Sequence, residues 1–344
     1  MVPLLGLNTE ELRTVAATSG VQAFRGNQLA EWLYQRNARD FDRMSNLPPA
    51  FLESLQKHFI IGRSKIIITQ RSTDGTVKLL LELSDGARIE TVGLPYSSHY
   101  SCCVSTQAGC PVGCGFCATG QSGFKRNLTA GEIIDQVLSI GEILKETGNH
   151  GRGRVDHVTF MGMGEPLLNY DATVKTLKLL NNELGLSARN LTVSTIGQVP
   201  GIRRLSQEKL PVTLAISLHA PTDDLRHQLI PGFVRWTVAE IISAGRDYVS
   251  QTGRRLTIEY CLLNDVNDHA GEAQQLADLL QGLNCHVNLI PFNPAEGLPY
   301  TASPPQHVQA FSNLLAKRGI QVTERARRGA DIDAACGQLK QRNC

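Results

Sequence analysis

Runs typical of buried strands alternate with runs typical of amphipathic helices from about residue 96 onward, and this alternation constrains the fold more than any other feature. Several strand-like runs are almost continuously apolar, as in parallel strands covered on both faces. The expected strands are 101–106, 155–161, 191–194, 212–218, 255–263, 286–291 and 321–325. The expected helices are 129–145, 171–184, 238–250, 270–280 and 306–317. Repeated βα units predict an α/β protein with a partial (β/α) TIM-like barrel.

Two segments of different character precede the barrel. Residues 8–59 have helical periodicity, with a break at Pro48-Pro49. Three β-rich runs within 65–94 are separated by Asp74-Gly75 and Asp85-Gly86, which are hairpin signals, and so predict a short antiparallel meander. The expected parts are a helical N-terminal accessory domain at 1–62, a β-hairpin extension at 63–95, the barrel at 96–328 and a C-terminal tail at 329–344.

Composition sets limits on where the chain works. Its 344 residues carry a formal net charge of +2, so binding of nucleic acid would depend on local basic groups rather than on global charge. The sequence has no stretch of 18 apolar residues and no basic segment before its apolar start, so we expect neither a membrane span nor a signal peptide. We therefore expect a cytoplasmic protein whose nine cysteines are ligands, reactive thiols or core residues rather than a disulfide framework.

Three cysteines lie within eight residues after the first barrel strand, in Cys110-Pro-Val-Gly-Cys114-Gly-Phe-Cys117. Soft thiolate ligands select iron–sulfur clusters, zinc or cuprous copper. The spacing does not match the paired Cys-x₂-Cys of zinc sites, and three ligands would leave one iron of a cubane open to a bound molecule. Two alternatives remain: buried cysteines without a metal, or a zinc site completed by His99, Cys102 or Cys103.

Polar groups follow several other barrel strands, where a barrel enzyme places its chemistry. They are Gly164 and Glu165, Ser194, Ser217-Leu218-His219, and Asn293. Taken singly, each could equally be a turn or a residue that caps a loop. Together they would line one rim of the barrel.

The motif Cys-x₃-Cys-x₂-Cys, with Phe116 before the last cysteine, resembles that of radical S-adenosylmethionine (SAM) enzymes. More closely, the chain resembles the RlmN/Cfr family of radical SAM RNA adenine methyltransferases. The resembling segments are Arg-Ile-Glu-Thr-Val at 88–92 and those at 103–110, 123–128, 160–166, 217–221 and 331–339. The helical N-terminal segment fits the family's accessory RNA-binding domain.

The resemblance implies two cofactors. A [4Fe–4S] cluster would be held by Cys110, Cys114 and Cys117. SAM would be bound at the open iron and by Gly164, Glu165, Ser194, Ser217, Leu218, His219 and Asn293. An electron donor such as flavodoxin would be a partner.

The resemblance also implies the reaction, which is methylation of an adenine ring carbon with two SAM molecules. Cys336 in the C-terminal tail would first take a methyl group and become S-methylcysteine. Cys103 would release the product by forming a transient disulfide with Cys336, and Glu90 would accept a proton, although how these two residues share the proton transfer stays open. The expected substrates are 23S rRNA at the peptidyl-transferase centre and tRNA at the adenine 3′ to the anticodon, both methylated at C2.

Alternatives accompany these assignments. Gly-Glu-Pro166 and Ala220-Pro221 favour the C2 type over the C8-methylating Cfr type. Another radical SAM enzyme acting on a small molecule, or a zinc-bound RNA-binding module, would leave Cys336 without a role.

The proposed catalytic residues also have plainer interpretations. Glu90 lies in an alternating strand, where a glutamate commonly faces solvent, and one of Cys102 and Cys103 should point inward. Three arginines, Arg325, Arg327 and Arg328, could favour the thiolate of Cys336, whereas Asp331 and Asp333 oppose it. Cys261 and Cys285 match no family role and are interpreted as core residues.

Overall fold

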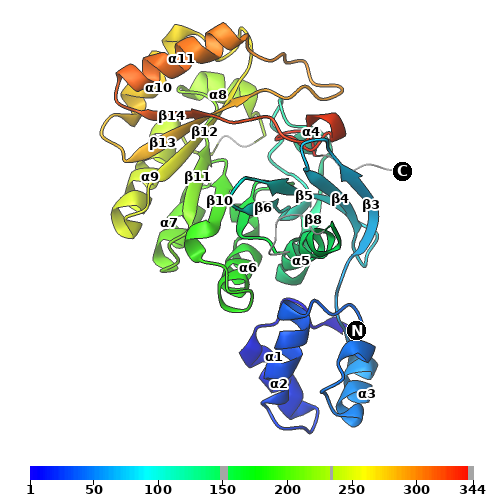
Figure 1. The fold of residues 1–344 in the computed structure, drawn as a ribbon. Helices are drawn as coiled ribbons and strands as arrows, with labels where there is room; N and C mark the ends of the chain where they lie inside the picture. The colour runs from blue at the N-terminus through cyan, green and yellow to red at the C-terminus, as the bar shows by residue number, and fades with distance from the viewer. Residues whose placement is uncertain (148–153, 233–234, 340–344) are drawn as a thin grey trace.

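The computed structural model describes residues 1–147, 154–232 and 235–339, and its centre is a ten-stranded mixed sheet (Figure 1). Neighbouring strands follow the order β14-β13-β12-β11-β10-β9-β6-β5-β4-β3. Pairing is parallel from β14 to β6, and β14 pairs only with β13 in the described chain, so the barrel is open. The parallel strands are β6 (Tyr100–Cys103), β9 (His157–Phe160), β10 (Leu191–Thr195), β11 (Thr213–Ser217), β12 (Leu256–Leu262), β13 (Cys285–Pro291) and β14 (Gln321–Glu324). The predicted partial barrel is confirmed.

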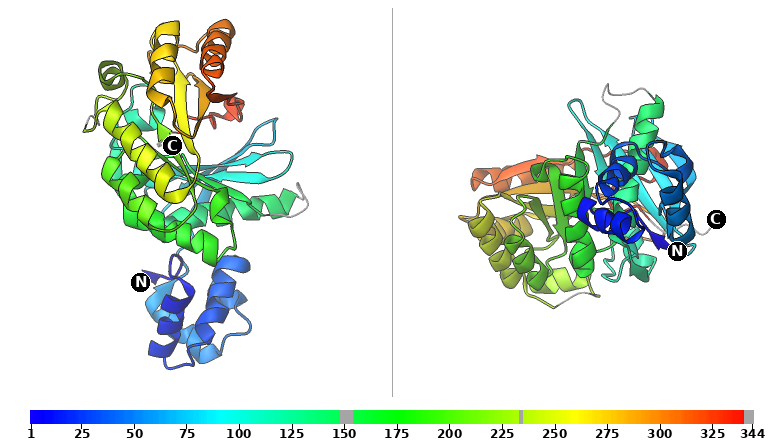
Figure 2. Two further views of the ribbon diagram at one scale, coloured as in Figure 1. Left: turned by 90° about the vertical axis from the view of Figure 1, so that its left-hand side faces the viewer. Right: turned by 90° about the horizontal axis from the view of Figure 1, so that it is seen from below.

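Helices follow the strands and cover the outer side of this sheet (Figures 1 and 2). They are α5 (Ala130–Thr147), α6 (Tyr170–Asn182), α7 (Val199–Gln207), α8 (Asp223–Leu229), α9 (Val238–Thr252), α10 (Ala270–Leu280) and α11 (Pro305–Lys317). Helix α9 shows why the sequence folds this way: a capping box of Thr237 and Glu240 starts it, and Gly253 ends it at φ +65°. None of the helices within the described ranges is both long and apolar enough to cross a membrane.

The antiparallel strands continue the barrel sheet instead of forming a separate hairpin. They are β3 (Lys65–Arg71), β4 (Val77–Glu82) and β5 (Arg88–Pro95), and β5 pairs with β6. Val92 lies opposite Lys78 on one side and opposite Cys103 on the other. Because directly paired residues point to the same face of a sheet, Lys78, Val92 and Cys103 form one row across three strands.

The N-terminal segment forms a small helical module, set apart from the sheet in both figures. Its helices are α1 (Thr9–Thr18), α2 (Arg25–Ala30), which continues into a π-helical turn (Glu31–Gln35), and α3 (Pro49–His58), and a short parallel pair joins β1 (Val2–Pro3) to β2 (Phe59–Ile60). Gly26 lies where α2 crosses α1, because a Cβ there would be 2.4 Å from Arg13 Cα. The close packing of these two helices therefore requires glycine at this position.

A buried ion pair attaches the module to the barrel. Arg63, just after β2, pairs with Asp135 on α5, and their side chains are 3% and 0% exposed. The second Asp135 oxygen accepts the Ser64 N–H at 2.7 Å, and Glu142 lies 3.4 Å from the Arg63 guanidinium. The pair therefore ties the segment that follows the module to helix α5.

We expect Asp135→Ala to lower the free energy of unfolding by about 3 kcal/mol, because it leaves the buried Arg63 charge with only Glu142 as a carboxylate partner. Urea unfolding of the variant measures this loss. The matched control is Glu31→Ala, which breaks a pair with Arg36 whose side chains are 45% and 48% exposed and should cost less than about 1 kcal/mol. Equal costs for the two variants would contradict a structural role for the buried pair.

Candidate active site

The three clustered cysteines lie in the loop between β7 (Gln107–Gly109) and the short helix α4 (Ala118–Gln121). Strand β7 pairs with β8 (Phe124–Asn127), and the Cys110 N–H donates to the Gly123 carbonyl at 2.9 Å, which closes the loop. Gly109 has φ +81°, and a Cβ on it would lie 1.9 Å from that same carbonyl oxygen. The tight turn that gathers the thiols therefore requires glycine beside the first cysteine.

The environment of these thiols suits a bound metal. Burial raises the pKa of Cys110 to about 12 and the pKa of Cys114 well above its usual value, and the neighbouring thiols add to both shifts. A bound metal would keep such thiols deprotonated. Three thiols from one tight loop, all lining one pocket, form a donor set that fits an iron–sulfur cluster.

Glu165 lies after β9, at the wall of the same pocket. One of its carboxylate oxygens accepts the Leu167 N–H at 3.0 Å, and the other accepts the Ile196 N–H at 2.8 Å. Burial raises the pKa of Glu165 to about 7, although these hydrogen bonds oppose the shift. Gly164 has φ +102°, and a Cβ there would lie 2.6 Å from Gln107 Cβ, so the loop can approach β7 only with glycine at this position.

Ser194, Ser217 and His219 complete this side of the pocket. The two serine hydroxyls lie 3.1 Å apart on adjacent strands. His219 Nδ1 accepts the Cys261 N–H at 3.0 Å, and its ring packs edge-on against Phe116. Burial and the Arg226 charge lower the pKa of His219 to about 3, so the ring is neutral and carries its proton on Nε2.

The low pKa of His219 predicts a loss of stability in acid. Between about pH 6.5 and pH 3 the unfolded chain binds a proton on this histidine and the folded chain does not, so the free energy of unfolding falls as the pH falls. Asparagine tolerates the positive φ of +61° at position 219, so we expect His219→Asn to fold but to be less stable than wild type at pH 7. Below pH 6.5 the free energy of unfolding of this variant should fall less steeply with falling pH, by the slope that corresponds to about one bound proton. Urea unfolding at several pH values tests this, with exposed His58→Asn as control. Parallel pH curves for wild type and His219→Asn would contradict it.

Cys336 lies on a loop after a single 3₁₀ turn (Ala330–Ile332) and borders both this pocket and an adjoining one. Asn293 donates to the Cys336 carbonyl at 3.2 Å, and the Ala118 N–H donates to the Gly337 carbonyl at 2.8 Å. These contacts connect the loop both to the segment after β13 and to the helix after the cysteine cluster. Asn293 lines the adjoining pocket and holds this loop.

Arg325, directly after β14, lines both pockets with Cys336. Its guanidinium lies 3.9 Å from Glu259 and 3.6 Å from Met161 Sδ, and the Coulombic interaction with Cys336 raises the pKa of Arg325. The two other arginines line the adjoining pocket, where Arg327 donates to the Phe292 carbonyl and Arg328 stacks on Tyr96.

Cys103 and Glu90 lie on the face of the sheet that borders the adjoining pocket. Cys103 lines that pocket, and burial raises its pKa to about 11 while Arg325 opposes the shift. Glu90 is 2% exposed and lies two residues before Val92, a residue that also lines the pocket. Its burial excludes the interpretation that it simply faces solvent. Cys102 is the member of the cysteine pair that points into the core, with its sulfur 3.6 Å from Thr91 Oγ1.

Two sequence assignments look different in the structure. The side chain of Leu218 lies in the hydrophobic core and not on the pocket wall, so only its backbone could take part in binding. Cys261 is buried, as a core residue should be, but it also lines the pocket. Burial is the main cause that raises its pKa, and Cys336 and Cys117 add to the shift.

Arg226 and Asn267 were not anticipated. The Arg226 charge faces Cys114 and Glu165, and Asn267 donates to the carbonyls of both His219 and Cys261. No sequence signal could have identified them, because both come close to the site only through long-range packing.

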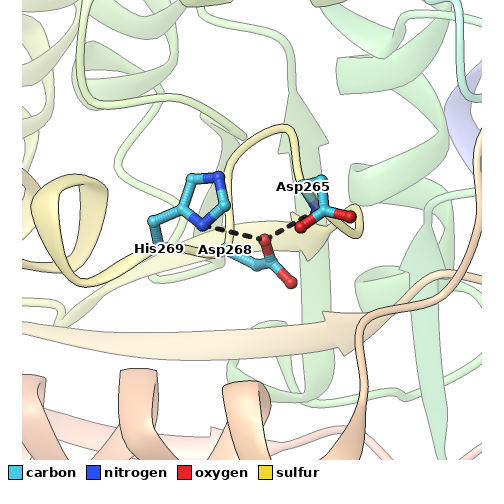
Figure 3. A group of neighbouring side chains, drawn as sticks. All are labelled: Asp265, Asp268 and His269. Carbon is cyan, nitrogen blue, oxygen red and sulfur yellow. Dashed lines mark hydrogen bonds and ion pairs between the residues drawn. The ribbon is translucent and has the colours of Figure 1, made fainter.

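A second group of potential metal ligands lies in the loop between β12 and α10 (Figure 3). Asp268 accepts the Asp265 N–H at 3.0 Å and contacts His307 Nδ1 at 3.1 Å, while His269 Nδ1 is 3.9 Å away. The buried Asp268 carboxylate therefore already has partners, and the group stabilises the loop that carries Asn267.

The fold and the three-cysteine loop at the mouth of its barrel define a radical SAM enzyme, and residues 104–277 match the model of the Radical SAM superfamily. A crystal structure of a radical SAM methyltransferase from Sphaerobacter thermophilus superposes with a TM-score of 0.95 at 43% identity, covering 99% of this chain and 100% of that one. Enzymes of this class use a [4Fe–4S] cluster and SAM, as the sequence predicted.

The particular family follows from the rest of the chain. Residues 2–61 match the model of the ribosomal RNA large subunit methyltransferase N-terminal domain. The probable dual-specificity RNA methyltransferase RlmN of Gloeobacter violaceus is 48% identical over 99% of this chain and 96% of its own, and that of Thermosynechococcus vestitus is 46% identical over 98% of both. The chain belongs to the RlmN family, and the resemblance drawn from its motifs is confirmed.

Proposed function

We propose that this enzyme methylates C2 of an adenine in 23S rRNA, at the peptidyl-transferase centre, and C2 of the adenine 3′ to the anticodon in tRNA. The observation that carries the proposal is one continuous pocket wall bearing the cluster cysteines, Cys336 and Arg325, with Cys103 in the adjoining pocket that Cys336 also borders. Relatives named as dual-specificity RNA methyltransferases, similar over nearly their whole length, support both substrates.

When bound, the cluster and SAM would supply a methyl group and a 5′-deoxyadenosyl radical. Cys110, Cys114 and Cys117 would hold the cluster, and Gly164, Glu165, Ser194, Ser217 and His219 would surround SAM. Neutral His219 offers an N–H without adding charge beside the cluster. Leu218 would contribute its backbone only, and Asn293 would act through the Cys336 loop.

Cys336 would take the methyl carbon and pass it to the adenine ring. The Arg325 guanidinium lines both pockets that Cys336 borders and so places a positive charge near its sulfur. Glu90 would accept the proton that leaves the ring carbon. Cys103 would then attack the Cys336 sulfur: the sulfur–sulfur bond forms, the sulfur–carbon bond breaks, and the carbon keeps the electron pair and takes a proton to become the methyl group of the RNA. The Cys103–Cys336 disulfide would be reduced by an external thiol before the next turnover.

We further propose a cytoplasmic location and an electron donor such as flavodoxin. Unpaired thiols throughout the described chain fit a reducing compartment. The helical module at 1–62 would bind RNA, and the segments 63–95, 96–328 and 329–344 would form the extension, the barrel and the tail with the catalytic cysteine.

Mass spectrometry of nucleosides from a strain that lacks this protein tests the function directly. We expect 2-methyladenosine to disappear from both 23S rRNA and tRNA and to return with a plasmid-borne copy. Loss of 8-methyladenosine would instead assign the enzyme to the C8 type. Unchanged modification of both RNAs would reject RNA methylation and favour a small-molecule substrate.

A further inference from the structure

A buried lysine connects the proposed proton acceptor to the segment that carries Cys336. Lys78 on β4 is 2% exposed, and its ammonium lies 3.5 Å from a carboxylate oxygen of Glu90 on β5. The same ammonium donates to the Asp333 carbonyl at 3.1 Å. Asp333 lies three residues before Cys336, so one side chain touches both parts of the proposed proton-transfer and carbon-transfer machinery.

The location of this pair is set by strand register. Lys78 lies opposite Val92, which lies opposite Cys103, so the lysine and the resolving cysteine share one face of the sheet. Glu90 lies two residues from Val92 on the same face. The charged pair therefore lies beside the pocket that Cys103 and Cys336 border, and not on the outer surface.

Electrostatics make Glu90 depend on Lys78. A buried carboxylate without a counter-charge becomes protonated rather than staying ionised. A protonated Glu90 could not accept a proton. The ammonium beside it therefore compensates the charge that the reaction needs, and its contact with Asp333 fixes where that charge lies relative to Cys336.

The Cys336 loop does not depend on Lys78 alone. Asp74 accepts the Gly329 N–H at 3.0 Å, Asn293 holds the Cys336 carbonyl, and Gln338 donates to the Pro294 carbonyl at 2.9 Å. Removal of the lysine should therefore leave the loop in place and change the state of Glu90.

We propose that Lys78 is a positioning residue that pairs with the Glu90 carboxylate and aligns it with the Cys336 segment for the proton transfer that precedes product release. This inference rests on the proposed function. It concerns only steps after the carbon has been attached to RNA, so methylation of Cys336 itself should not require Lys78.

The test compares reconstituted full-length holoenzymes: wild type, Lys78→Met, Lys78→Arg and Glu90→Gln. Arg88→Met is the matched control, because it breaks an ion pair of the same β4–β5 ladder whose side chains are about 30% exposed. Three quantities are measured with an rRNA fragment: S-methylation of the Cys336 peptide by mass spectrometry, the single-turnover rate of RNA product formation, and the covalent RNA–protein adduct on denaturing gels.

We expect Lys78→Met to methylate Cys336 as wild type does, to form product about 10²-fold more slowly, and to accumulate adduct as Glu90→Gln does. Lys78→Arg should recover most of the rate, and Arg88→Met should match wild type. Wild-type turnover in Lys78→Met would overturn the proposal. If Lys78→Met lost both Cys336 methylation and thermal stability, and Lys78→Arg restored neither, the role of Lys78 would be purely structural and the proposal would be overturned. A wild-type enzyme that methylates no RNA would instead refute the proposed function.

Discussion

Replacing Cys336 with alanine is expected to reduce methyl transfer to RNA by at least about 10⁴-fold, because the change removes the sulfur that carries the carbon. The other thiols near the pocket, Cys103 and Cys261, lie at fixed places on strands β6 and β12 and not on the Cys336 loop, so neither is expected to take its place. Transfer of labelled methyl groups from SAM to an rRNA fragment measures the effect.

The matched variant is Cys103→Ala, which keeps Cys336 and removes the residue that would release the product. It should form the covalent RNA–protein adduct and then stop, whereas Cys336→Ala should form none. Both variants keep the three cluster ligands and should keep the brown colour of the holoprotein. Product formation by Cys336→Ala at more than a few per cent of the wild-type rate would remove the S-methylcysteine from the mechanism.

Replacing Cys114 with alanine is expected to abolish the cluster and with it all activity. Cys114 would be the central ligand of the loop, and its thiol interacts with both Cys110 and Cys117. Two remaining thiolates cannot hold a cubane that already has one iron without a protein ligand. Iron and sulfide analysis and the visible absorption of anaerobically reconstituted protein measure the loss.

Cys285→Ala is the control for this experiment, since Cys285 is also buried but lies at the start of β13 and lines neither pocket. It should keep the full iron content. Colourless wild-type protein that contains zinc would contradict the cluster assignment. Cluster content unaffected by Cys114→Ala would do the same.

Much of the fold could be predicted because its strands and helices carry strong periodic patterns. The helix expected at 270–280 has those bounds in α10, and each expected barrel strand is present. Helices α7 and α8 were not expected: α7 contains Pro200 and Gly201 in its first turn, and α8 has only seven residues. Such segments resemble loops in sequence, although proline is favourable at the start of a helix.

The site was predictable where its residues are adjacent in sequence, and not where they meet across strands. The cluster cysteines and Gly164-Glu165 lie on short motifs: the cysteine spacing indicated a metal site, and the SAM-binding role of Gly164-Glu165 came from the family resemblance. The burial of Glu90 and its pairing with Lys78 depend on which residues oppose each other in β4, β5 and β6, and sequence does not give that register. An alternating strand with a glutamate looks the same whether its polar face meets solvent or a pocket.

The Arg63–Asp135 pair restrains the connection between the helical module and the barrel. When the module binds RNA as proposed, a bound RNA can be modified only where the target adenine lies at the distance that separates the module from the catalytic pocket. Substrate choice would then be read from RNA shape, and a change in the length of the connection near residues 60–64 should shift or abolish modification without touching a catalytic group.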